Sequence, residues 1–398
     1  MKLKMLLGSF FLLFPVFLTG CWSSHEVNTL AITVCIGIDK IENGYRVTEQ
    51  VINPKAIASK RSINESPIIL YTSEGQSIGE IIQSLTTQSS RRIYHSHLRM
   101  VIFGEEVARD GIKDILDYFM REREYRTDFY FAVAKGASAK EVLSVLTPLE
   151  AIPGISMYSS LETSQNFWAP TKSIKIIELI NLITAEGKNL VLPSIEISAG
   201  TAMPNSTEVL NKDTGIKKPI FTGLGVFRKD KLVGWLNEDE SKGYNYITGN
   251  VKKTVGTIYY GNNDRITIDV MKVKSDMEVY RVNDKPAIAV NIDMLGTIKT
   301  AVGTLDVSKE ENQSLLNKLS EDRVTYFCNK AITTVRTEFK TDIFGFGEAI
   351  HKKYPELWGT IKDNWNDDFV DLPVNITVKS KVTQLGQITT PLFGEEKE

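Results

Sequence analysis

Apolar and polar residues in the first half of the chain follow two periods, one typical of strands and one typical of helices. Residues 30–39 form a β-branched apolar run, residues 44–52 alternate, and Asn43-Gly44 predicts a hairpin turn between them. Further strands are predicted at residues 68–72, 97–103, 129–134 and 190–197, and helices from Ser77, over 111–124, from Ser138 and over 173–186. This alternation predicts a mixed or partly parallel sheet with helices packed on it.

Two of these helices carry a start signal. Ser77 is followed by Glu80, and Ser138 is followed by Glu141. This is the spacing of a capping box, in which the serine and glutamate side chains each accept a hydrogen bond from the other residue's backbone N–H. We therefore expect both helices to begin at these serines.

The second half of the chain has the pattern of an antiparallel sheet with one long helix. Strands are predicted at residues 221–228, 232–236, 251–260, 266–282, 287–300 and 370–382, a short helix at 238–246, and short helices over 345–365 interrupted by Pro355. From Ser308, with Glu311 as its capping-box partner, one helix keeps an apolar face as far as Phe339. At 1.5 Å per residue this helix is about 50 Å long, which is enough to cover the sheet.

A stretch between the two halves loses both periods, and a domain boundary is predicted there. The predicted fold class is α+β and multidomain, with an N-terminal mixed-sheet α/β-like half and a C-terminal antiparallel sheet covered by a long helix. The predicted segments are a signal peptide at 1–20, an N-terminal α+β domain at 21–198, a linker or loop at 199–219, a C-terminal antiparallel α+β domain at 220–392 and a tail at 393–398. The sequence leaves open whether the N-terminal half is one domain or two.

The first residues of the chain have the order of a secretion signal that ends in a lipobox. Lys2 and Lys4 precede an apolar run at 5–18, and Leu18-Thr19-Gly20-Cys21 follows. The run is shorter than the roughly 20 residues that span a bilayer, so a retained transmembrane helix is the weaker interpretation. An ordinary secretory signal with a chance cysteine is the other alternative. We expect Cys21 to carry an N-acyl and an S-diacylglycerol group, because one acyl chain alone binds a membrane only marginally.

The composition is that of an ordinary globular protein. Of the 398 residues, 42% are hydrophobic and 24% charged. Removal of the signal peptide takes away two of the 47 basic residues and leaves 45 against 49 acidic ones, a formal charge of about −4. This balance gives no indication of a nucleic-acid partner. Cys35 and Cys328 lie in apolar stretches and could pair, but free buried thiols are the favoured prediction.

No catalytic set follows from the polar residues. His95 and His97 would share a face of a strand and could offer two imidazoles to a metal, but no spacing suggests a third ligand. An ordinary hydrogen-bonding role for His97 is the favoured interpretation. Ser96 and His97 invite a hydrolase hypothesis, yet the chain has no G-x-S-x-G elbow. We therefore predict no enzyme, no metal site and no cofactor.

Three further patterns have ordinary structural explanations. The segment 344–348, FGFGE, lacks the lysine of a phosphate-binding loop, and a tight turn explains it better. A solvated or salt-bridged helix end is the default interpretation of the charged residues Arg121, Glu122, Arg123, Glu124 and Arg126. Core packing is favoured over an aromatic pocket or interface for Trp235, Tyr244 and Tyr246.

Four separated blocks of the chain resemble the Ger(x)C family, the lipoprotein C subunits of the nutrient germinant receptors of endospore-forming bacteria. The blocks are Gly20-Cys21-Trp22 with Glu26-Val27 and LAITVCIGIDK; SHLRMVIFGEEVARDGIKDILDYFMREREYR at 96–126; FTGLGVFRKDKLVGWLNEDESKGYNYITG at 221–249; and DIFGFGEAIHKKYPELWGTIKDNW at 342–365. They cover essentially the whole chain after the signal in the same order. Ser23 stands where the family often has an acidic residue, and the loop at 199–218 matches nothing in the family.

The resemblance implies a non-enzymatic receptor subunit needed for spore germination. Such a subunit is anchored through the lipid on Cys21 at the outer face of the spore's inner membrane and works with integral-membrane A and B subunits. The transporter-like B subunit is the usual candidate for holding the nutrient, and whether the C subunit binds any ligand is open. The blocks at 96–126 and 221–249 are candidate interaction surfaces, with Arg99, Glu105, Arg121 and Glu124 as the residues to test.

Two alternatives come from other classes of protein. A substrate-binding lipoprotein would deliver a small solute to a transporter and would need a cleft between two similar α/β lobes, against which the antiparallel second half argues. An envelope enzyme is the least favoured class. It would require a deep pocket with convergent, strongly perturbed titrating groups.

Overall fold

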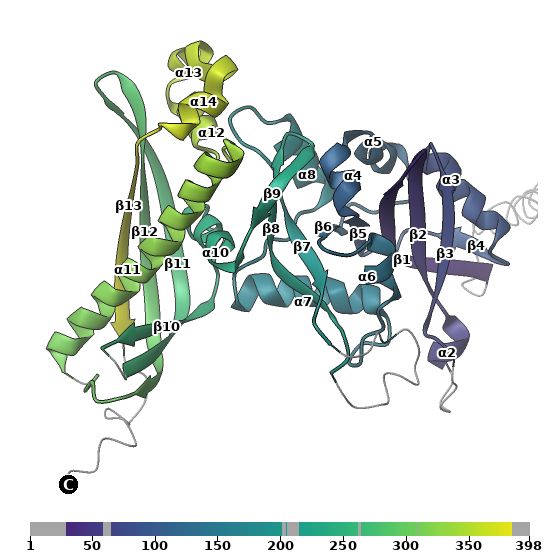
Figure 1. Cartoon of the computed structure of the whole chain (residues 1–398), viewed down its shortest axis with the longest axis horizontal. Helices are drawn as coiled ribbons and strands as arrows, with labels where there is room; N and C mark the ends of the chain where they lie inside the picture. The colour runs from purple at the N-terminus through teal and green to yellow at the C-terminus, as the bar shows by residue number, and fades with distance from the viewer. Residues whose placement is uncertain are drawn as a thin grey trace, which may run out of the picture.

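Two sheets lie at opposite ends of an elongated molecule (Figure 1). The structure is a computed structural model that describes residues 29–58, 65–200, 204, 215–261, 264–307 and 309–383. The predicted signal peptide, Cys21 and the predicted tail at 393–398 lie outside these residues. None of the helices in the described part of the chain is long and apolar enough to cross a membrane.

The first sheet has nine strands and mixed direction. Its strands are β1 (Leu30–Ile41), β2 (Gly44–Ile52), β3 (Ile68–Gly75), β4 (Arg92–Tyr94), β5 (Met100–Phe103), β6 (Tyr130–Ala134), β7 (Val191–Ile197), β8 (Pro219–Arg228) and β9 (Lys231–Leu236). The order is β3-β2-β1-β5-β6-β7-β8-β9, and β4 pairs with β1. Strands β1, β5, β6 and β7 run parallel, whereas β2–β3 and β8–β9 add antiparallel strands at the two edges. The prediction of a mixed sheet is confirmed.

Helices cover both faces of this sheet, as Figure 1 shows for α4, α5 and α8 above it and α6 and α7 below it. The helices of this half are α2 (Pro54–Ala58), α3 (Ile78–Ser84), η3 (Leu85–Thr87), α4 (Glu105–Asp110), α5 (Lys113–Arg121), α6 (Ala139–Ser144), α7 (Pro153–Phe167) and α8 (Ile176–Thr184). Because successive strand residues face opposite sides, Val101 and Phe103 enter one core while Met100 and Ile102 enter the other. The central strands are therefore apolar throughout.

The two predicted capping boxes had different outcomes. At α6, Ser138 accepts from the Glu141 N–H and the Glu141 side chain accepts from the Ser138 N–H, as predicted. Ser77 occupies the N-cap position of α3, but its side chain makes no capping hydrogen bond, so that box is wrong. The start of α6 has a second support from β1, because the Asp39 carboxylate accepts the N–H groups of Ala139 at 2.7 Å and Lys140 at 3.0 Å.

The second sheet has four strands in the order β10-β11-β12-β13. They are β10 (Thr254–Tyr260), β11 (Asp264–Val282), β12 (Lys285–Val302) and β13 (Val374–Thr383). The first three are antiparallel, as predicted, but β13 runs parallel to β12. The reason is that the chain leaves the end of β12, crosses through helices over one face and returns to start β13 at the opposite end. The sheet is therefore mixed at this edge.

A long helix covers one face of this sheet. The crossover consists of α11 (Glu310–Thr334), the π-helical turn η4 (Val335–Phe339), α12 (Phe346–Lys353), α13 (Pro355–Ile361), η5 (Lys362–Asn364) and α14 (Trp365–Val370). Figure 1 shows α11 lying across the strands, which confirms the predicted cover. The predicted cap residue Ser308 lies outside the described residues, and the helix begins at Glu310 with Lys309 at the N-cap.

The hairpin β8–β9 belongs to the first sheet, because β8 pairs with β7 along its length. The sequence analysis assigned this hairpin to the C-terminal half, and that assignment differs from the observed hydrogen bonding. Alternation identifies a hairpin but not the strand beside it. The two sheets are consequently divided after β9 rather than before β8.

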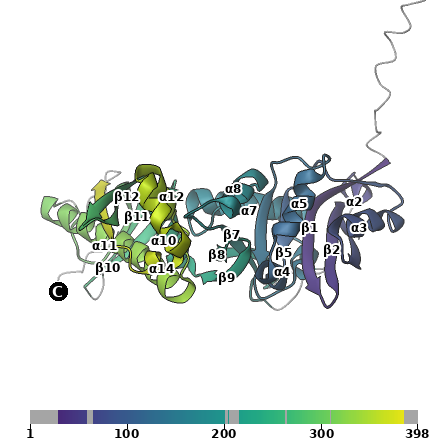
Figure 2. The ribbon, with the colours of Figure 1, turned by 90° about the horizontal axis from the view of Figure 1, so that it is seen from above.

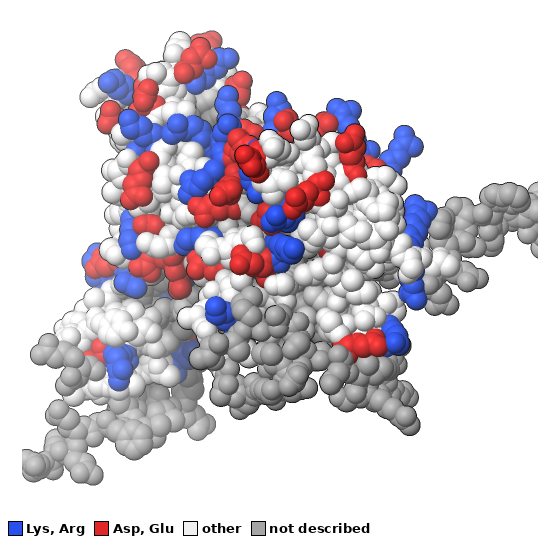
Figure 3. Space-filling model, turned by 45° about the vertical axis from the view of Figure 1, so that its right-hand side comes forward, with Lys and Arg blue, Asp and Glu red and all other residues white. Residues whose placement is uncertain are grey.

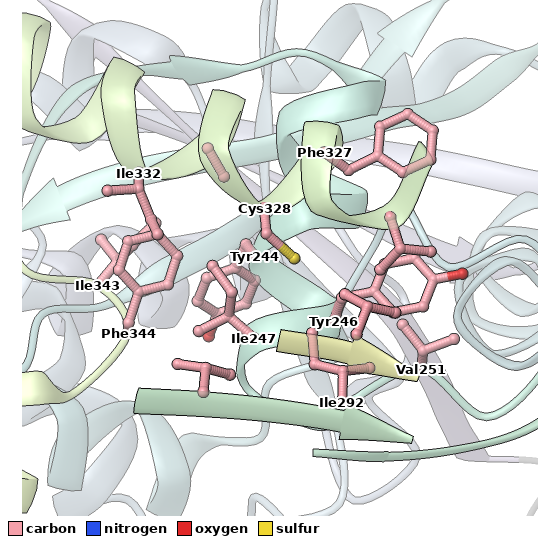
Figure 4. Close-up of a cluster of buried hydrophobic side chains, with 14 of the residues drawn as sticks. Tyr244, Tyr246, Ile247, Val251, Ile292, Phe327, Cys328, Ile332, Ile343 and Phe344 are labelled. Carbon is pink, nitrogen blue, oxygen red and sulfur yellow. The ribbon is translucent and has the colours of Figure 1, made fainter. Parts of the chain in front are cut away.

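Helix α10 (Glu238–Ile247) joins the two sheets and is buried between them. Its Tyr244, Tyr246 and Ile247 pack with Phe327 and Cys328 of α11 (Figure 4). Core packing is thus confirmed for both tyrosines, while Trp235 is half-buried and its Nε1 donates to Glu105 at 3.4 Å. Cys35 and Cys328 are both buried and free, as predicted.

Candidate functional site

The first polar centre of the molecule is a buried histidine between two carboxylates. His95 lies between β4 and β5, and its side chain is 7% exposed. Its Nε2 is 3.0 Å from Glu49 Oε1, and its Nδ1 is 3.1 Å from Glu124 Oε2. The Glu49 side chain is fully buried on β2 and also accepts the Thr33 hydroxyl at 2.7 Å. A protonated imidazole donates from both ring nitrogens, so it satisfies both carboxylates at once.

The charge of this histidine follows from its surroundings. Burial lowers the pKa of His95, but the hydrogen bonds and charges of Glu124 and Glu49 outweigh burial and raise the pKa to about 9. His95 is therefore a buried cation at neutral pH. This positive charge offsets the free-energy cost of burying the Glu49 carboxylate completely.

The metal and hydrolase hypotheses for His95, Ser96 and His97 gain no support from this geometry. Strand β5 begins at Met100, so the two histidines do not alternate on a strand. The exposed His97 ring has an edge contact with Tyr94 at 6.1 Å, and it is His95 that has the hydrogen-bonding role. The Ser96 hydroxyl donates to the Glu124 carbonyl at 2.8 Å. Within the described residues no group of three His, Cys, Asp or Glu side chains could hold a metal ion.

A surface cleft lies beside this centre. The cleft, called here the α5 cleft, has a volume of about 520 Å³ and lies between α5 and the segment 76–79. Its lining includes Tyr45, Gln76, Ile78, Asp114, Tyr118 and Arg121. The Tyr118 ring contacts Tyr125 at 6.0 Å, and the Tyr125 ring contacts His95 at 5.0 Å. Aromatic packing thus connects the cleft to the buried cation.

The four residues predicted as interaction candidates are dispersed over three places. Arg99 lies over the Tyr158 ring and 4.0 Å from Asp128. Glu105 begins α4 at the other end of β5 and pairs with Arg109 at 2.7 Å. Arg121 is 78% exposed, lines the α5 cleft and pairs with Asp117 at 2.7 Å, whereas Glu124 is a partner of His95. Only Arg121 and Glu124 lie in one region.

Sequence reasoning missed a second polar centre, at Asp342. Its fully buried carboxylate accepts the backbone N–H groups of Phe344 at 3.0 Å, Gly345 at 2.9 Å and Gly347 at 2.8 Å, and Trp365 Nε1 at 3.2 Å. Burial raises the pKa of Asp342 to about 6, against the opposing effect of these donors. The glycine-rich segment is a tight turn, as predicted, with Gly345 at φ +86°.

This second centre lies at the junction of the two halves. The Asn189 N–H donates to the Asp342 carbonyl at 2.8 Å, and the Glu348 N–H donates to the Gly187 carbonyl at 3.1 Å. A side chain at Gly187 would stand 2.5 Å from the backbone of Gly347, so the segments approach as closely as glycine permits. The sequence did contain a signal for this centre. An aspartate just before a G-x-G turn places a carboxylate next to free backbone N–H groups.

Among the described residues, neither the fold nor these two centres presents a set of side chains arranged for catalysis. Family models match both halves of the chain: "Spore germination protein N-terminal domain" matches residues 23–197, and "Spore germination B3/GerAC like, C-terminal" matches residues 222–386. The chain therefore belongs to the Ger(x)C family of spore germination proteins, and the resemblance of the four blocks is confirmed.

Individual relatives match over almost their whole length. Spore germination protein KC of Bacillus subtilis is 26% identical, with 99% of both chains covered. Spore germination protein B3 of the same organism is 23% identical over 93% of this chain and 95% of its own. The crystal structure of the GerBC protein has a TM-score of 0.57 and 19% identity, and covers 87% of this chain and 96% of that one. This structural likeness shows the fold alone.

Proposed function

We propose that this chain is the C subunit of a nutrient germinant receptor, held at the outer face of the spore's inner membrane by lipid on Cys21. It acts by contacts with integral-membrane A and B subunits. The observation that supports the proposal is the match to both family domains, in order and over nearly the whole chain. Two relatives named as spore germination proteins match over 99% and 93% of this chain.

The anchor determines what contacts the folded body can make. Cys21 stands eight residues before Thr29, the first residue that the structure describes. Two acyl chains of a diacylglycerol would hold this body in a thin layer above the bilayer. Weak contacts with membrane subunits then act at high effective concentration.

The two polar centres stabilise the fold and do not indicate catalysis. His95 has a carboxylate at each ring nitrogen, and four N–H donors from the fold surround the Asp342 carboxylate. Groups with perturbed pKa values often mark active sites, but structural networks perturb pKa values too. Since internal partners occupy both groups, neither is free to transfer a proton to a substrate.

The test of the anchor is a Cys21→Ala variant in spores. We expect the subunit to be lost from the membrane fraction and nutrient-triggered germination to fall strongly, with Ser23→Ala as a control that leaves the residues from Leu18 to Cys21 intact. Germination kinetics and the levels of all three receptor subunits in spore membranes are the measurements. Normal germination with normal assembly in the Cys21 variant would contradict the proposal.

The α5 cleft supports a second candidate function, the binding of a small solute that is then delivered to a transporter. Its volume of about 520 Å³ falls within the usual range for ligand sites. The cleft lies inside the N-terminal half, however, and the two sheets differ in topology, so it is not a cleft between similar lobes. Calorimetry of the unlipidated body with a panel of germinants tests this candidate. Saturable binding that a Tyr118→Ala exchange removes would favour it, and no heat of binding would reject it.

A further inference from the structure

In the part of the chain that the structure describes, one face of the second sheet carries no helix. Figure 2 shows β11 and β12 on one side of α11, so the other face of these strands is open. Neighbouring residues on paired strands share a face of a sheet. On the open face the register forms two adjacent rows, Lys272–Leu295–Lys381 and Lys274–Asp293–Lys379. The four lysines are called here the lysine face, and they surround a shallow hollow of about 340 Å³.

The two rows of the lysine face hold four lysines and one carboxylate, that of Asp293, while Asp269, Asp276 and Glu278 stand in neighbouring rows of the same face. Asp293 is the acidic residue in the hollow, and Lys274 pairs with Asp276. Within the part of the chain that the structure describes, Lys272, Lys379 and Lys381 form no ion pair, and all three residues are exposed. Elsewhere, as on the side shown in Figure 3, basic and acidic side chains are intermixed. A chain with a net charge of −2 therefore presents a local basic surface.

Exposed apolar residues lie beside these lysines. Leu295 is 39% exposed and stands between Lys272 and Lys381 in its row. Met271, next to Lys272 in the chain, is 44% exposed, and Tyr259 on β10 is 71% exposed. Tyr259 also faces the open side, because the neighbouring Ile258 packs inward, but it pairs with Arg265 and stands further along the sheet than the lysines. Lysine with exposed leucine, methionine and tyrosine is typical of a surface that meets the headgroup region of a bilayer.

The edge of the sheet next to this face is closed to strand addition. Two side chains of α11 reach β13: Glu321 accepts the Ser380 N–H at 3.0 Å, and Asn317 accepts the Val382 N–H at 2.7 Å. A peptide that added to β13 as a further strand would need these N–H groups. The open face, rather than this edge, is thus the free surface of the sheet.

The orientation of the face agrees with attachment at the N-terminus. In Figure 2 the open face of the sheet looks towards the same side as the start of β1, at the other end of the molecule. We propose that the lysine face rests on an anionic membrane and binds the phosphate groups of its lipids. This proposal rests on the proposed location of the chain at a membrane. Lipid at one end and the lysine face at the other would then lay the elongated body along the bilayer.

The test uses the whole chain after residue 20, with Cys21→Ala so that no lipid is attached, and measures sedimentation with vesicles. We expect binding to phosphatidylglycerol vesicles, little binding to phosphatidylcholine vesicles, and weaker binding at higher salt. The combined variant Lys272→Gln, Lys379→Gln and Lys381→Gln should bind about 100-fold more weakly, since each lysine near an anionic surface contributes about fivefold.

A matched control carries the same change in net charge. Lys113, Lys352 and Lys362 are exposed lysines on helices away from the open face, and their combined change to glutamine should leave vesicle binding within about twofold. Equal binding by both triple variants, or no binding of the parent protein to phosphatidylglycerol, would overturn the proposal. If the parent protein does not bind phosphatidylglycerol, an acidic protein surface becomes the alternative partner of the lysine face. Because no lipid is attached to the protein, the outcome is independent of the Cys21 experiment.

Discussion

The His95 centre and the Asp342 centre each compensate the burial of a carboxylate, but they do so with different groups. Each contains a carboxylate with no exposed surface, Glu49 in one and Asp342 in the other. At His95 the compensation is an opposite charge on a second titrating side chain. At Asp342 it is a set of N–H dipoles from a turn and an indole. The first solution depends on the protonation of the histidine, whereas the second has no titrating partner.

Removal of the Asp342 carboxylate should have the largest effect on stability. Asp342→Ala leaves buried N–H donors without an acceptor and loosens the turn that joins the two halves, at a cost of about 4 kcal/mol. Urea unfolding of the unlipidated body measures the change. Asp363→Ala, an exposed aspartate of the same segment, is the control and should cost under about 0.5 kcal/mol. Equal stability of the two variants would contradict the role given to Asp342.

Removal of His95 should have the next largest effect. His95→Ala leaves the buried Glu49 carboxylate without its counter-charge, and we expect a loss of about 3 kcal/mol in the free energy of unfolding. The exposed His97 provides the control, since His97→Ala should change stability by under about 0.5 kcal/mol. Should the two histidine variants unfold at the same urea concentration, the imidazole is not the compensating charge.

The two centres should lose their contributions in different pH ranges. The pKa of His95 rises from 6.5 to about 9 on folding, so its contribution is complete below pH 6.5 and is lost as pH rises through about 9. The pKa of Asp342 rises from 3.8 to about 6, so folding favours its protonated form. Its contribution is complete below pH 3.8 and is lost as pH rises through about 6. Each loss is on the order of 3 kcal/mol.

Unfolding free energies across pH 4–10 measure both steps. His95→Gln should remove the alkaline step and retain the acidic one, and Asp342→Asn should do the reverse. A parent protein whose stability is level from pH 6.5 to 9 would show that His95 does not gain a proton on folding.

A smaller effect is expected at the helix crossing beside the junction. Gly243 lies on α10, where a Cβ would stand 2.0 Å from the Phe327 carbonyl oxygen of α11. Gly243→Ala should therefore cost about 2 kcal/mol, although alanine normally favours a helix. Gly359 on α13 has no neighbour within 4 Å of its Cβ position, and Gly359→Ala should be neutral or stabilising. Thermal unfolding of both variants gives the comparison, and the same sign of change in both would contradict it.

The smallest effect on stability is expected at Arg121. Its side chain is 78% exposed and pairs with Asp117 on the same helix, so Arg121→Ala should cost at most about 0.5 kcal/mol. A loss of germination or of receptor assembly in this variant would then report a contact rather than misfolding. Unchanged assembly and germination in Arg121→Glu would remove this residue from the candidate interaction surfaces.

Local patterns predicted most elements but not their partners. The capping box at Ser138, the interruption of the short helices at Pro355 and the turn at Gly345 follow from residues close together in the chain. The pairing of β8 with β7 and the parallel direction of β13 depend on how distant segments pack, which no local pattern contains. Helix α7 was missed because its buried residues, which include Met157 and Leu161, are sparse among polar ones.

The polar centres show the same limit. The sequence drew attention to His95 and His97 as a pair, but the pairing assumed a strand at 97–103, and β5 begins only at Met100. Glu49 and Glu124 reach His95 from positions 46 and 29 residues away, and Trp365 reaches Asp342 from 23 residues away. Contacts over such separations arise from the tertiary fold. Spacing alone could not identify them.

Strands β8 and β9 complete the first sheet late in synthesis. The chain is made from its N-terminus, so β1 to β7 precede the hairpin, and β7 has an unpaired edge until residues 219–228 follow. An open edge invites pairing with another chain. A fragment that stops at residue 198 would retain this edge permanently and should aggregate. A gene truncated after residue 236 is therefore the shortest one expected to yield the complete set of strands of the N-terminal sheet.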